Sequence, residues 1–489
     1  MSKTVFVSTS IPYVNGRPHI GHALEFVQAD VISRYHRLQG HNTFFLTGTD
    51  ENSLKNVRAA AEAGIPTQEL CDRNSGVFQA LVPALHISND DFIRTSRDIR
   101  HALGAQKFWT RTRPGDIYKK SYSGRYCVGC EDFYTEKEMP DGICPEHQTP
   151  LEVIEEENYF FRLSAYQDQL FDLLESGRLQ VIPDSRRNEM LAFMTSGLQD
   201  FSISRSRERA GHWGIPVPGD ENQVMYVWFD ALTNYITALN YSEHDAPTAA
   251  AGERFQTYWL NDCQRIHVIG KGINRFHAIY WPAMLLSTGL PLPDVVFVHG
   301  YLTANGQKIS KSLGNVVDPL AHVEKYGAEA VRYYLLRGVS PFEDGDYAEH
   351  RVRELYNADL ANNLGNLIRR IETLGDKAGY VLRTEHAIPA APDGFCEAVQ
   401  EFRFHDAAAA LWNIATGLNQ EIDRIKPWEL QKQGKEQELD NFLDQAVSQI
   451  RQIGHWLEPL LPAASKKITL RFHGGKPLKQ SEPLFPRWL

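Results

Sequence analysis

The chain has 489 residues, of which 42% are hydrophobic, so it is too long for one ordinary core and we expect two or three domains. No apolar run reaches the roughly 18 residues of a membrane span, and the first strand has no basic leader, so we expect neither a membrane protein nor an exported one. The formal net charge of −10 argues against a protein that coats nucleic acid through its overall charge.

The N-terminal elements predict the start of a nucleotide-binding α/β sheet. Short apolar runs alternate with helical patterns in the order strand, loop, helix, strand, helix. These elements lie at residues 5–7, 10–18, 23–38, 44–46 and 52–63. Asp50 follows the second strand, at the end where ligands meet the sheet in open α/β folds.

His19 and His22 flank Ile20 and Gly21 where the first loop becomes a helix. Backbone N–H groups and the helix dipole at such a position can receive a phosphate, and Gly21 lets a nucleotide approach closely. The two imidazoles lie three residues apart on one side of the first turn, so they can donate hydrogen bonds to phosphate oxygens as negative charge develops. Taken alone, the motif is equally consistent with a surface loop that carries two histidines by chance.

A change of composition marks residues 114–158, which are rich in Tyr, Cys, Gly and acidic residues and predict an insertion between two halves of the sheet. Two pairs, Cys127-x-x-Cys130 and Cys144-x-x-His147, are separated there by 13 residues, a spacing typical of a compact tetrahedral zinc site. Four protein ligands leave no open position, so the predicted ion is structural. Buried thiols and a disulfide are the alternatives, and the small number of cysteines favours a reducing cytoplasm.

The α/β pattern then resumes with three elements, at residues 267–270 (strand), 278–287 (helix) and 295–298 (strand). Lys308 and Lys311 follow Asn305-Gly306, which is a strong hairpin-turn signal. The lysine loop can close over a triphosphate and offer two ammonium groups to the leaving pyrophosphate. A solvated basic loop is the alternative.

Amphipathic helical patterns dominate the chain beyond about residue 346, at 355–382, 402–425 and 439–457. In this predicted helical domain Asn366 and Arg370 share one helix face, and Trp428 stands at a helix start. An indole can stack on an unpaired base, and Asn and Arg can read base edges. A solvated helix face and a packing tryptophan are the alternatives.

Several motifs together resemble the methionyl-tRNA synthetases, a family of class I aminoacyl-tRNA synthetases, over nearly the whole chain. They are Tyr13-Val14-Asn15-Gly16 before the histidine pair, Gly48-Thr49-Asp50-Glu51, the cysteine knuckle, Tyr226-Val227-Trp228-Phe229-Asp230-Ala231, the lysine loop through Leu313-Gly314-Asn315, and Lys426-Pro427-Trp428-Glu429. The resemblance implies that methionine attacks the α-phosphate of Mg-ATP to give methionyl-adenylate and pyrophosphate. The methionyl group then passes to the 3′-terminal adenosine of initiator and elongator tRNA(Met).

The same resemblance implies a fold: a Rossmann-type α/β catalytic domain with a zinc-bearing insertion, followed by an all-α anticodon-binding bundle. We therefore expect the first catalytic half at residues 1–113, the insertion at 114–224 with its knuckle at about 120–158, the second half at 225–300, the lysine-loop and stem-contact region at 301–348, and the helical domain at 349–489.

The site residues implied by the resemblance form three groups. The ATP contacts are the catalytic His19, His22, Lys308 and Lys311, with Gly21, Gly270 and Ser310. Methionine needs apolar walls and aromatic rings near its sulfur: the rings are Tyr13, Trp228 and Tyr235, the wall is Ile11, Leu232, Ile273 and His277, and Asp50 offers a carboxylate to the ammonium group. The contacts to the CAU anticodon are Asn366, Arg370 and Trp428. Without the resemblance, a role as ordinary core aromatics is the favoured interpretation of Trp228 and Tyr235.

The chain departs from the family pattern at a few positions. Asn52-Ser53 stand where many members have His-Gly, Gly272 where many have Asp, Leu232 for a Pro, and Ile309 for a Met. The alternative functions are a specialised paralogue, either inhibitor-resistant or with another acceptor, and a catalytically silent RNA-binding homologue. We expect one structural Zn²⁺, Mg²⁺ with ATP, and a cytoplasmic monomer, because no dimerising module follows the helical domain.

Overall fold

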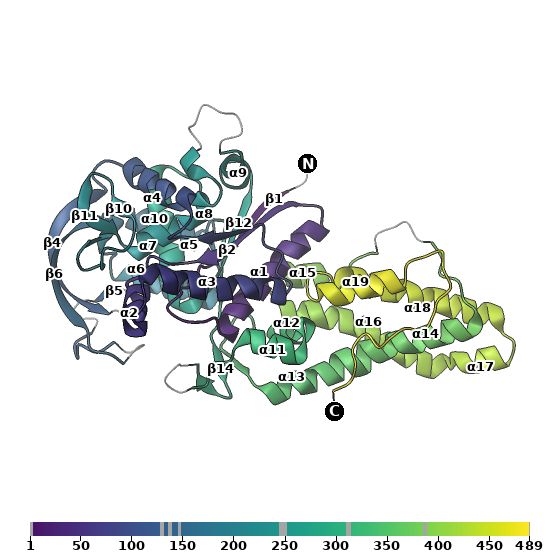
Figure 1. The fold of residues 1–489 in the computed structure, drawn as a ribbon. Coiled ribbons are helices and arrows are strands. Elements are labelled where there is room, and N and C mark those ends of the chain that lie inside the picture. Colours follow the sequence, from purple (N-terminus) through teal and green to yellow (C-terminus); the bar gives the residue numbers. More distant parts are fainter. Residues whose placement is uncertain are drawn as a thin grey trace. The chain divides into compact units, whose positions relative to one another are not determined.

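The computed structural model describes residues 3–127, 132–134, 139–144, 148–243, 252–309, 314–384 and 389–488, apart from the side chains of residues 132, 133 and 308. The chain forms two compact units (Figure 1). The sheet unit comprises Met1–Pro18, His41–Ala80 and Asn89–Val298, and the helical unit comprises His19–Gly40, Leu81–Ser88 and His299–Leu489. None of the described helices is long and apolar enough to cross a membrane.

A sheet of hydrophobic strands lies at the centre of the sheet unit. Within the described ranges six strands make it, in the order β3 (Asp91–Arg94), β2 (Asn42–Thr49), β1 (Thr4–Thr9), β12 (Gln264–Gly270), β13 (Val295–His299) and β7 (Gln180–Ile182). β1 pairs in parallel with both β2 and β12, and its residues Val5, Phe6 and Val7 are fully buried. Strands that are apolar on both faces suit a parallel sheet covered by helices. The four predicted strands are confirmed.

β7 is a strand of this sheet that the sequence did not predict. It lies inside residues 114–224, the stretch expected as an insertion, yet it pairs in parallel with β13 at the edge of the central sheet. A strand of three residues is too short to show a hydrophobic period.

Helices alternate with the strands of the sheet unit along the chain. They are α2 (Leu54–Ala63), α3 (Thr67–Ala84), α4 (Ile99–Arg111), α5 (Gln167–Glu175), α6 (Asp184–Thr195), α7 (Val227–Leu232), α8 (Asn234–Thr237), α9 (Glu253–Phe255) and α10 (Trp281–Thr288). α2 begins at Ser53, whose side chain accepts the N–H of Lys55 at 3.0 Å, and ends at Gly64, whose φ of 66° favours glycine. The predicted helices at 52–63 and 278–287 are confirmed.

Two smaller sheets lie within the expected insertion. β4 (Ile117–Cys127) and β6 (Glu152–Phe161) form a long antiparallel hairpin, with β5 (Asp132–Tyr134) and β8 (Phe201–Ser202) beside them. The second sheet contains β10 (Pro216–Val217), β11 (Asp220–Met225) and β9 (Ser204–Ser206). The backbone N–H of Tyr159 in β6 donates to the Ser204 hydroxyl in β9 at 2.8 Å, so the two sheets are joined.

The helical unit begins with α1 (Ile20–Leu38), which packs against α12 (Ala328–Arg337). A fully buried ion pair joins these helices, since Arg332 donates to Asp30 at 2.7 Å and neither side chain is exposed. The same guanidinium donates to the carbonyls of Leu85, Pro459 and Leu460 at 2.9–3.0 Å. α1 is therefore anchored to segments far along the chain.

A small sheet and a helical bundle complete the helical unit. The sheet contains β15 (Gln307–Lys308), β14 (Leu302–Ala304) and β16 (Gly345–Tyr347). Asn305 and Gly306, with φ of 52° and 76°, form the two-residue turn between β14 and β15. Two positive φ values are the mark of a type I′ turn, so the predicted hairpin is confirmed.

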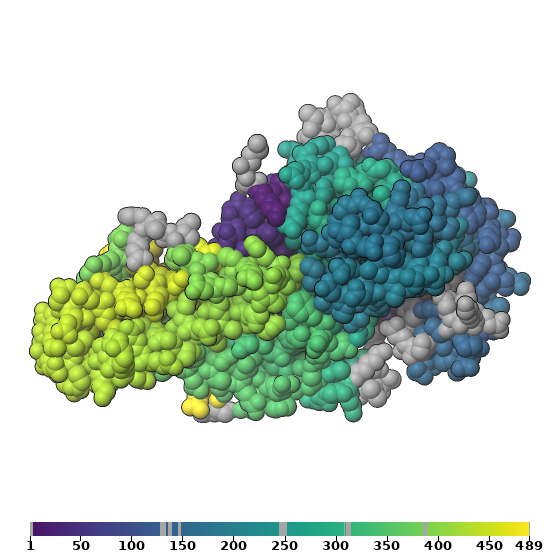
Figure 2. Space-filling model, turned by 180° about the vertical axis from the view of Figure 1, so that it is seen from behind, coloured from purple at the N-terminus to yellow at the C-terminus, as the bar shows by residue number. Residues whose placement is uncertain are grey.

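The helices of the bundle are α11 (Pro319–Tyr326), α13 (Glu349–Leu355), α14 (Asn366–Ala378), α15 (Phe395–Gln400), α16 (Phe404–Ile425), α17 (Pro427–Lys432), α18 (Glu436–Trp456) and α19 (Pro462–Arg471). α14, α16 and α18 lie side by side (Figure 1). Figure 2 shows the molecule from behind, with the bundle residues in green to yellow. The helical patterns predicted beyond residue 346 are confirmed. The first predicted helix, 355–382, consists of the end of α13, a π-helical stretch (Tyr356–Gly365) and α14, which stops at Gly379 with a φ of 64°.

Candidate active site

Aromatic rings from three elements meet in the sheet unit. Trp228, near the start of α7, stacks on Phe276 with ring centroids 3.8 Å apart and planes at 5°. Tyr13 meets the same indole edge-on at 6.3 Å. The indole N–H of Trp228 is buried and finds no hydrogen-bond partner among the described residues. The sequence predicted Tyr13 and Trp228 for this site but missed Phe276, which lies in a π-helical turn (Phe276–Tyr280).

Tyr235 and His277 form a hydrogen-bonded pair beside these rings. The Nδ1 of His277 lies 3.0 Å from the carbonyl of Ile273, and its Nε2 lies 2.7 Å from the Tyr235 hydroxyl. A carbonyl only accepts, so Nδ1 carries the proton and the Tyr235 hydroxyl donates to Nε2. Both side chains are buried, which fixes their orientation.

The predicted apolar wall lies against the same core. Leu232 is buried within it, and Ile11 and Ile273 are partly buried against it. Gly270 ends β12 at the carboxyl edge of the central sheet, and Gly272 lies in the short helical turn that follows (Lys271–Ile273). The three wall side chains thus pack in or against the hydrophobic core that also contains Trp228 and Phe276.

Two buried carboxylates next to the rings are both hydrogen-bonded to Asn52. Asp50 is 2% exposed and Asp230 is 0% exposed. The backbone N–H of Asn52 donates to Asp50 at 3.2 Å, and its side-chain amide donates to Asp230 at 3.0 Å. Asp50 also pairs with Tyr13 in an isolated parallel bridge. The sequence predicted Asp50 but gave Asp230 no role, although Asp230 stands in the motif that ends at Ala231.

Glu51 holds the loop that carries Asp50. Its side chain is fully buried, and Arg94 donates to both of its oxygens, at 2.7 and 3.2 Å. Thr49 donates to the same carboxylate at 2.9 Å, and the indole N–H of Trp213 donates to the Glu51 carbonyl at 2.7 Å. A charge paired in this way fixes the backbone on which Asp50 stands.

The histidine pair caps α1 in the helical unit. The Nδ1 of His19 accepts the N–H of Gly21 at 3.1 Å, and the Nδ1 of His22 accepts the N–H of His19 at 3.0 Å. Each imidazole that accepts at Nδ1 and is neutral carries its proton on Nε2. The two rings stack with centroids 3.8 Å apart.

Both imidazoles of the pair are held neutral. Burial lowers the pKa of His19 to about 4, against an ordinary value of 6.5. Burial holds the pKa of His22 well below its usual range, and the neighbouring His19 and His299 lower it further. Two uncharged rings with Nε2–H donors therefore stand at the start of α1.

The predicted lysine loop lies largely outside the described residues. Lys308 ends β15, and its backbone is described, whereas its side chain, Ser310 and Lys311 are not. In the predicted knuckle Cys127 and Cys144 are fully buried, and Cys130 and His147 lie outside the described residues. A tight turn follows Cys144, whose carbonyl accepts the N–H of Gln148 at 2.7 Å. The described residues, with two of the four predicted ligands, contain no group of three that could hold a metal.

The predicted anticodon residues lie on neighbouring helices of the bundle, since α14 contacts both α16 and α17. Asn366 is the exposed first residue of α14. Arg370, one turn later, donates to Asn419 at 3.2 Å and to Asp423 at 2.5 Å. Trp428 is 37% exposed, which is high for so large an apolar side chain.

Comparisons with known proteins agree on one family. The sequence matches the family described as tRNA synthetases class I (M) over residues 5–151 and 147–372. A methionine–tRNA ligase of Brucella suis biovar 1 (strain 1330) is 41% identical over 99% of this chain and 98% of the relative. One of Thermotoga maritima is 42% identical over 95% of this chain and 75% of the relative.

A solved structure is also similar to this chain. Mycobacterium tuberculosis methionyl-tRNA synthetase in complex with methionyl-adenylate superimposes with a TM-score of 0.90 at 38% identity, over 99% of this chain and 100% of that chain. The chain therefore belongs to the methionine–tRNA ligase family of class I tRNA synthetases, and it uses ATP to activate methionine and attach it to tRNA(Met).

Proposed function

We propose that His19, His22, Lys308 and Lys311 stabilise negative charge on ATP while methionine attacks its α-phosphate. The Nε2–H groups of two neutral imidazoles at the start of α1 support this role, because they are donors that need no proton from solvent. Gly21, Gly270 and Ser310 would complete the nucleotide contacts, and Mg²⁺ would accompany ATP. No side chain has to become covalently attached, so catalysis rests on positioning and charge stabilisation.

The ring cluster around Trp228 is proposed to hold the methionine side chain. Stacked and edge-on rings suit a polarizable thioether, and Ile11, Leu232 and Ile273 supply apolar contact. The observation that carries this assignment is the pair of buried carboxylates beside the rings: Asp50 accepts the backbone N–H of Asn52, and Asp230 accepts its side-chain amide. Buried carboxylates suit an ammonium ligand, and the rings suit the rest of the amino acid.

Asp50→Asn tests this assignment. Removing the charge should raise the KM for methionine in pyrophosphate exchange by about 10- to 100-fold, because a charge-assisted hydrogen bond to the ammonium is lost. The matched control is Asp262→Asn, which changes an exposed aspartate of the same unit. An unchanged KM for methionine in Asp50→Asn would remove Asp50 from the site.

One structural Zn²⁺ is proposed for the knuckle. Cys127, Cys130, Cys144 and His147 would hold it, and the complete burial of both Cys127 and Cys144 supports this, because thiols at the end of β4 and at a tight turn suit a closed site. When bound, the ion supplies a crosslink within the insertion and no catalytic position.

The helical bundle is proposed to read the CAU anticodon of initiator and elongator tRNA(Met) through Asn366, Arg370 and Trp428. The exposure of Trp428 and the position of Asn366 and Arg370 on one face of α14 support this role. We also propose that the enzyme acts as a cytoplasmic monomer.

A further inference from the structure

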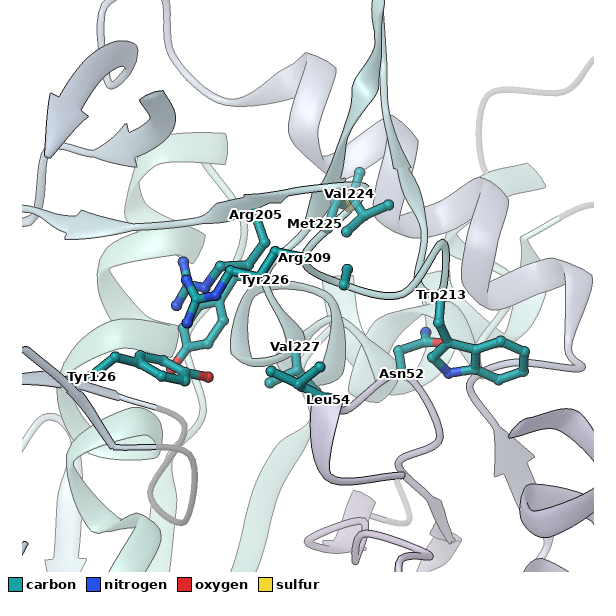
Figure 3. Close-up of a pocket in the computed structure, with 11 residues that line it drawn as sticks. Asn52, Leu54, Tyr126, Arg205, Arg209, Trp213, Val224, Met225, Tyr226 and Val227 are labelled. Atoms are coloured by element: carbon teal, nitrogen blue, oxygen red, sulfur yellow. The ribbon is translucent and has the colours of Figure 1, made fainter. Parts of the chain in front are cut away.

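A pocket lined by two arginines lies beside the proposed methionine site, within the sheet unit. Its interior has a water-accessible volume of about 30 Å³, and it opens to solvent. Figure 3 shows Arg205 and Arg209 at one end, next to Tyr126, and Trp213 with Asn52 at the other end. No carboxylate is among the described residues that line it.

The two guanidinium groups share one aromatic surface. Arg205 lies 4.2 Å from the ring centre of Tyr226 and 5.4 Å from that of Tyr126, and Arg209 lies 4.6 Å from that of Tyr126. Arg205 is 8% exposed and donates to the Ser202 hydroxyl at 2.9 Å and the Ser204 carbonyl at 2.7 Å. These contacts hold Arg205 rigidly while its positive charge stays in the pocket.

Arg209 makes a hydrogen bond through only one of its two terminal nitrogens within the described residues. One of its nitrogens donates to Glu156 at 3.2 Å, whereas the other terminal nitrogen is buried and finds no partner among the described residues. Burial lowers the pKa of Arg209. The carboxylate of Glu156 raises this pKa in part, and the neighbouring charge of Arg205 lowers it. A guanidinium in this position is stabilised by an added anion, and its planar fork suits a phosphate.

The pocket adjoins the atoms that must meet the acceptor. Tyr226 and Val227 line it and directly precede Trp228, and Asn52 lines it while donating to Asp230. In the second step of the reaction the 3′-terminal adenosine of tRNA must reach the methionyl carboxyl group. The last phosphodiester of the tRNA is attached to the 5′ oxygen of that adenosine, on the other side of the ribose from the hydroxyl that is acylated.

We propose that Arg209, supported by Arg205, binds a backbone phosphate at the 3′ end of tRNA and so positions the terminal adenosine for transfer. This rests on the proposed placement of methionine at Trp228. The phosphates of ATP offer the same chemistry, so the experiment separates the two sources.

Arg209→Gln is the direct test. The KM for tRNA in aminoacylation should rise about tenfold, because one charge-assisted contact is lost. The slope of log binding constant against log salt concentration should become less steep by about one, because one phosphate contact fewer is made. Methionine-dependent pyrophosphate exchange should keep its KM values for methionine and ATP. The control is Arg207→Gln, an exposed arginine two residues away that should change neither reaction.

A modified tRNA identifies the phosphate. A neutral methylphosphonate at the last linkage should weaken charging by the wild-type enzyme about tenfold and have little further effect in Arg209→Gln, because both changes remove the same contact. If the two losses multiply, Arg209 does not bind that linkage and the proposal is overturned. If Arg209→Gln raises the KM for ATP instead, the phosphate belongs to ATP and the proposal is equally overturned.

Glu156→Gln tests the proposal without removing an arginine. The substitution weakens the intramolecular partner of Arg209, so the KM for tRNA should fall or stay the same, while pyrophosphate exchange is unchanged. A tenfold rise in the KM for tRNA in Glu156→Gln would mean that Arg209 serves only to hold Glu156 in place.

Discussion

At the scale of single residues, hydrogen bonding decides which ring nitrogen of each histidine carries the proton. His19 and His22 accept backbone N–H groups at Nδ1, and His277 donates from Nδ1 to a carbonyl. The first two therefore present Nε2–H donors, and the third presents Nε2 as an acceptor to Tyr235. The same side chain is thus given opposite roles by its local backbone.

The lowered pKa of His19 predicts how activity depends on pH. Since its folded pKa is about 4, this imidazole stays neutral when the pH falls from 8 to 6, and pyrophosphate exchange should show no loss from its protonation near pH 6.5. The unfolded chain does bind a proton there, so the contribution of His19 to stability is complete above about pH 6.5 and declines as the pH falls toward 4. Exchange rates and urea midpoints over pH 5–8 measure both effects, and a break in exchange at pH 6.5 that His19→Asn removes would contradict the first.

At the scale of elements, the buried pair of Asp30 and Arg332 joins α1 to α12. Ser88 donates to Asp30 from both its backbone N–H (2.7 Å) and its hydroxyl (2.6 Å), and Arg34 donates to Asp30 at 2.8 Å. Arg34 in turn donates to Glu458 at 2.6 Å. The helix that carries the histidine pair is therefore fixed by charges and not only by apolar contact.

Arg332→Met should destabilise the helical unit by up to about 3–5 kcal/mol, because it removes one of the two guanidinium groups that neutralise the buried Asp30 carboxylate. A lower urea midpoint for unfolding measures the loss. Arg369→Met, on the exposed face of α14, is the control and should change stability by less than about 0.5 kcal/mol. Equal midpoints for the two variants would show that the ion pair contributes little.

Local chemistry explains which elements the sequence predicts. The hairpin at Asn305-Gly306 and the end of α2 at Gly64 depend on backbone angles that few residues adopt. A motif of one or two residues is therefore enough to predict them from the sequence. β7 has no such local signal, and its hydrogen-bonding partner β13 lies more than 100 residues away in the sequence. Phe276 and Asp230 joined the candidate site through contacts with Trp228 and Asn52, which lie far away in the sequence and carry no local signal.

At the scale of the whole molecule, the two reactions should be separable by mutation. Trp428→Ala should raise the KM for tRNA by about 5- to 150-fold, the range expected when a stacked base loses 1–3 kcal/mol, and should leave pyrophosphate exchange intact. Gln431→Ala, an exposed neighbour on α17, is the control. Equal damage to both reactions would mean that Trp428 supports the fold and does not contact tRNA.

The anchoring of α1 by Arg332 also has a consequence for synthesis on the ribosome. Asp30 and Arg332 are 302 residues apart, so at 5–20 residues per second about 15–60 s pass between their translation. During that interval a nascent chain carries a carboxylate that belongs in the interior but has not yet met its guanidinium. Helix α1 leaves the ribosome among the first elements, but its packing is complete only after α12 has been translated.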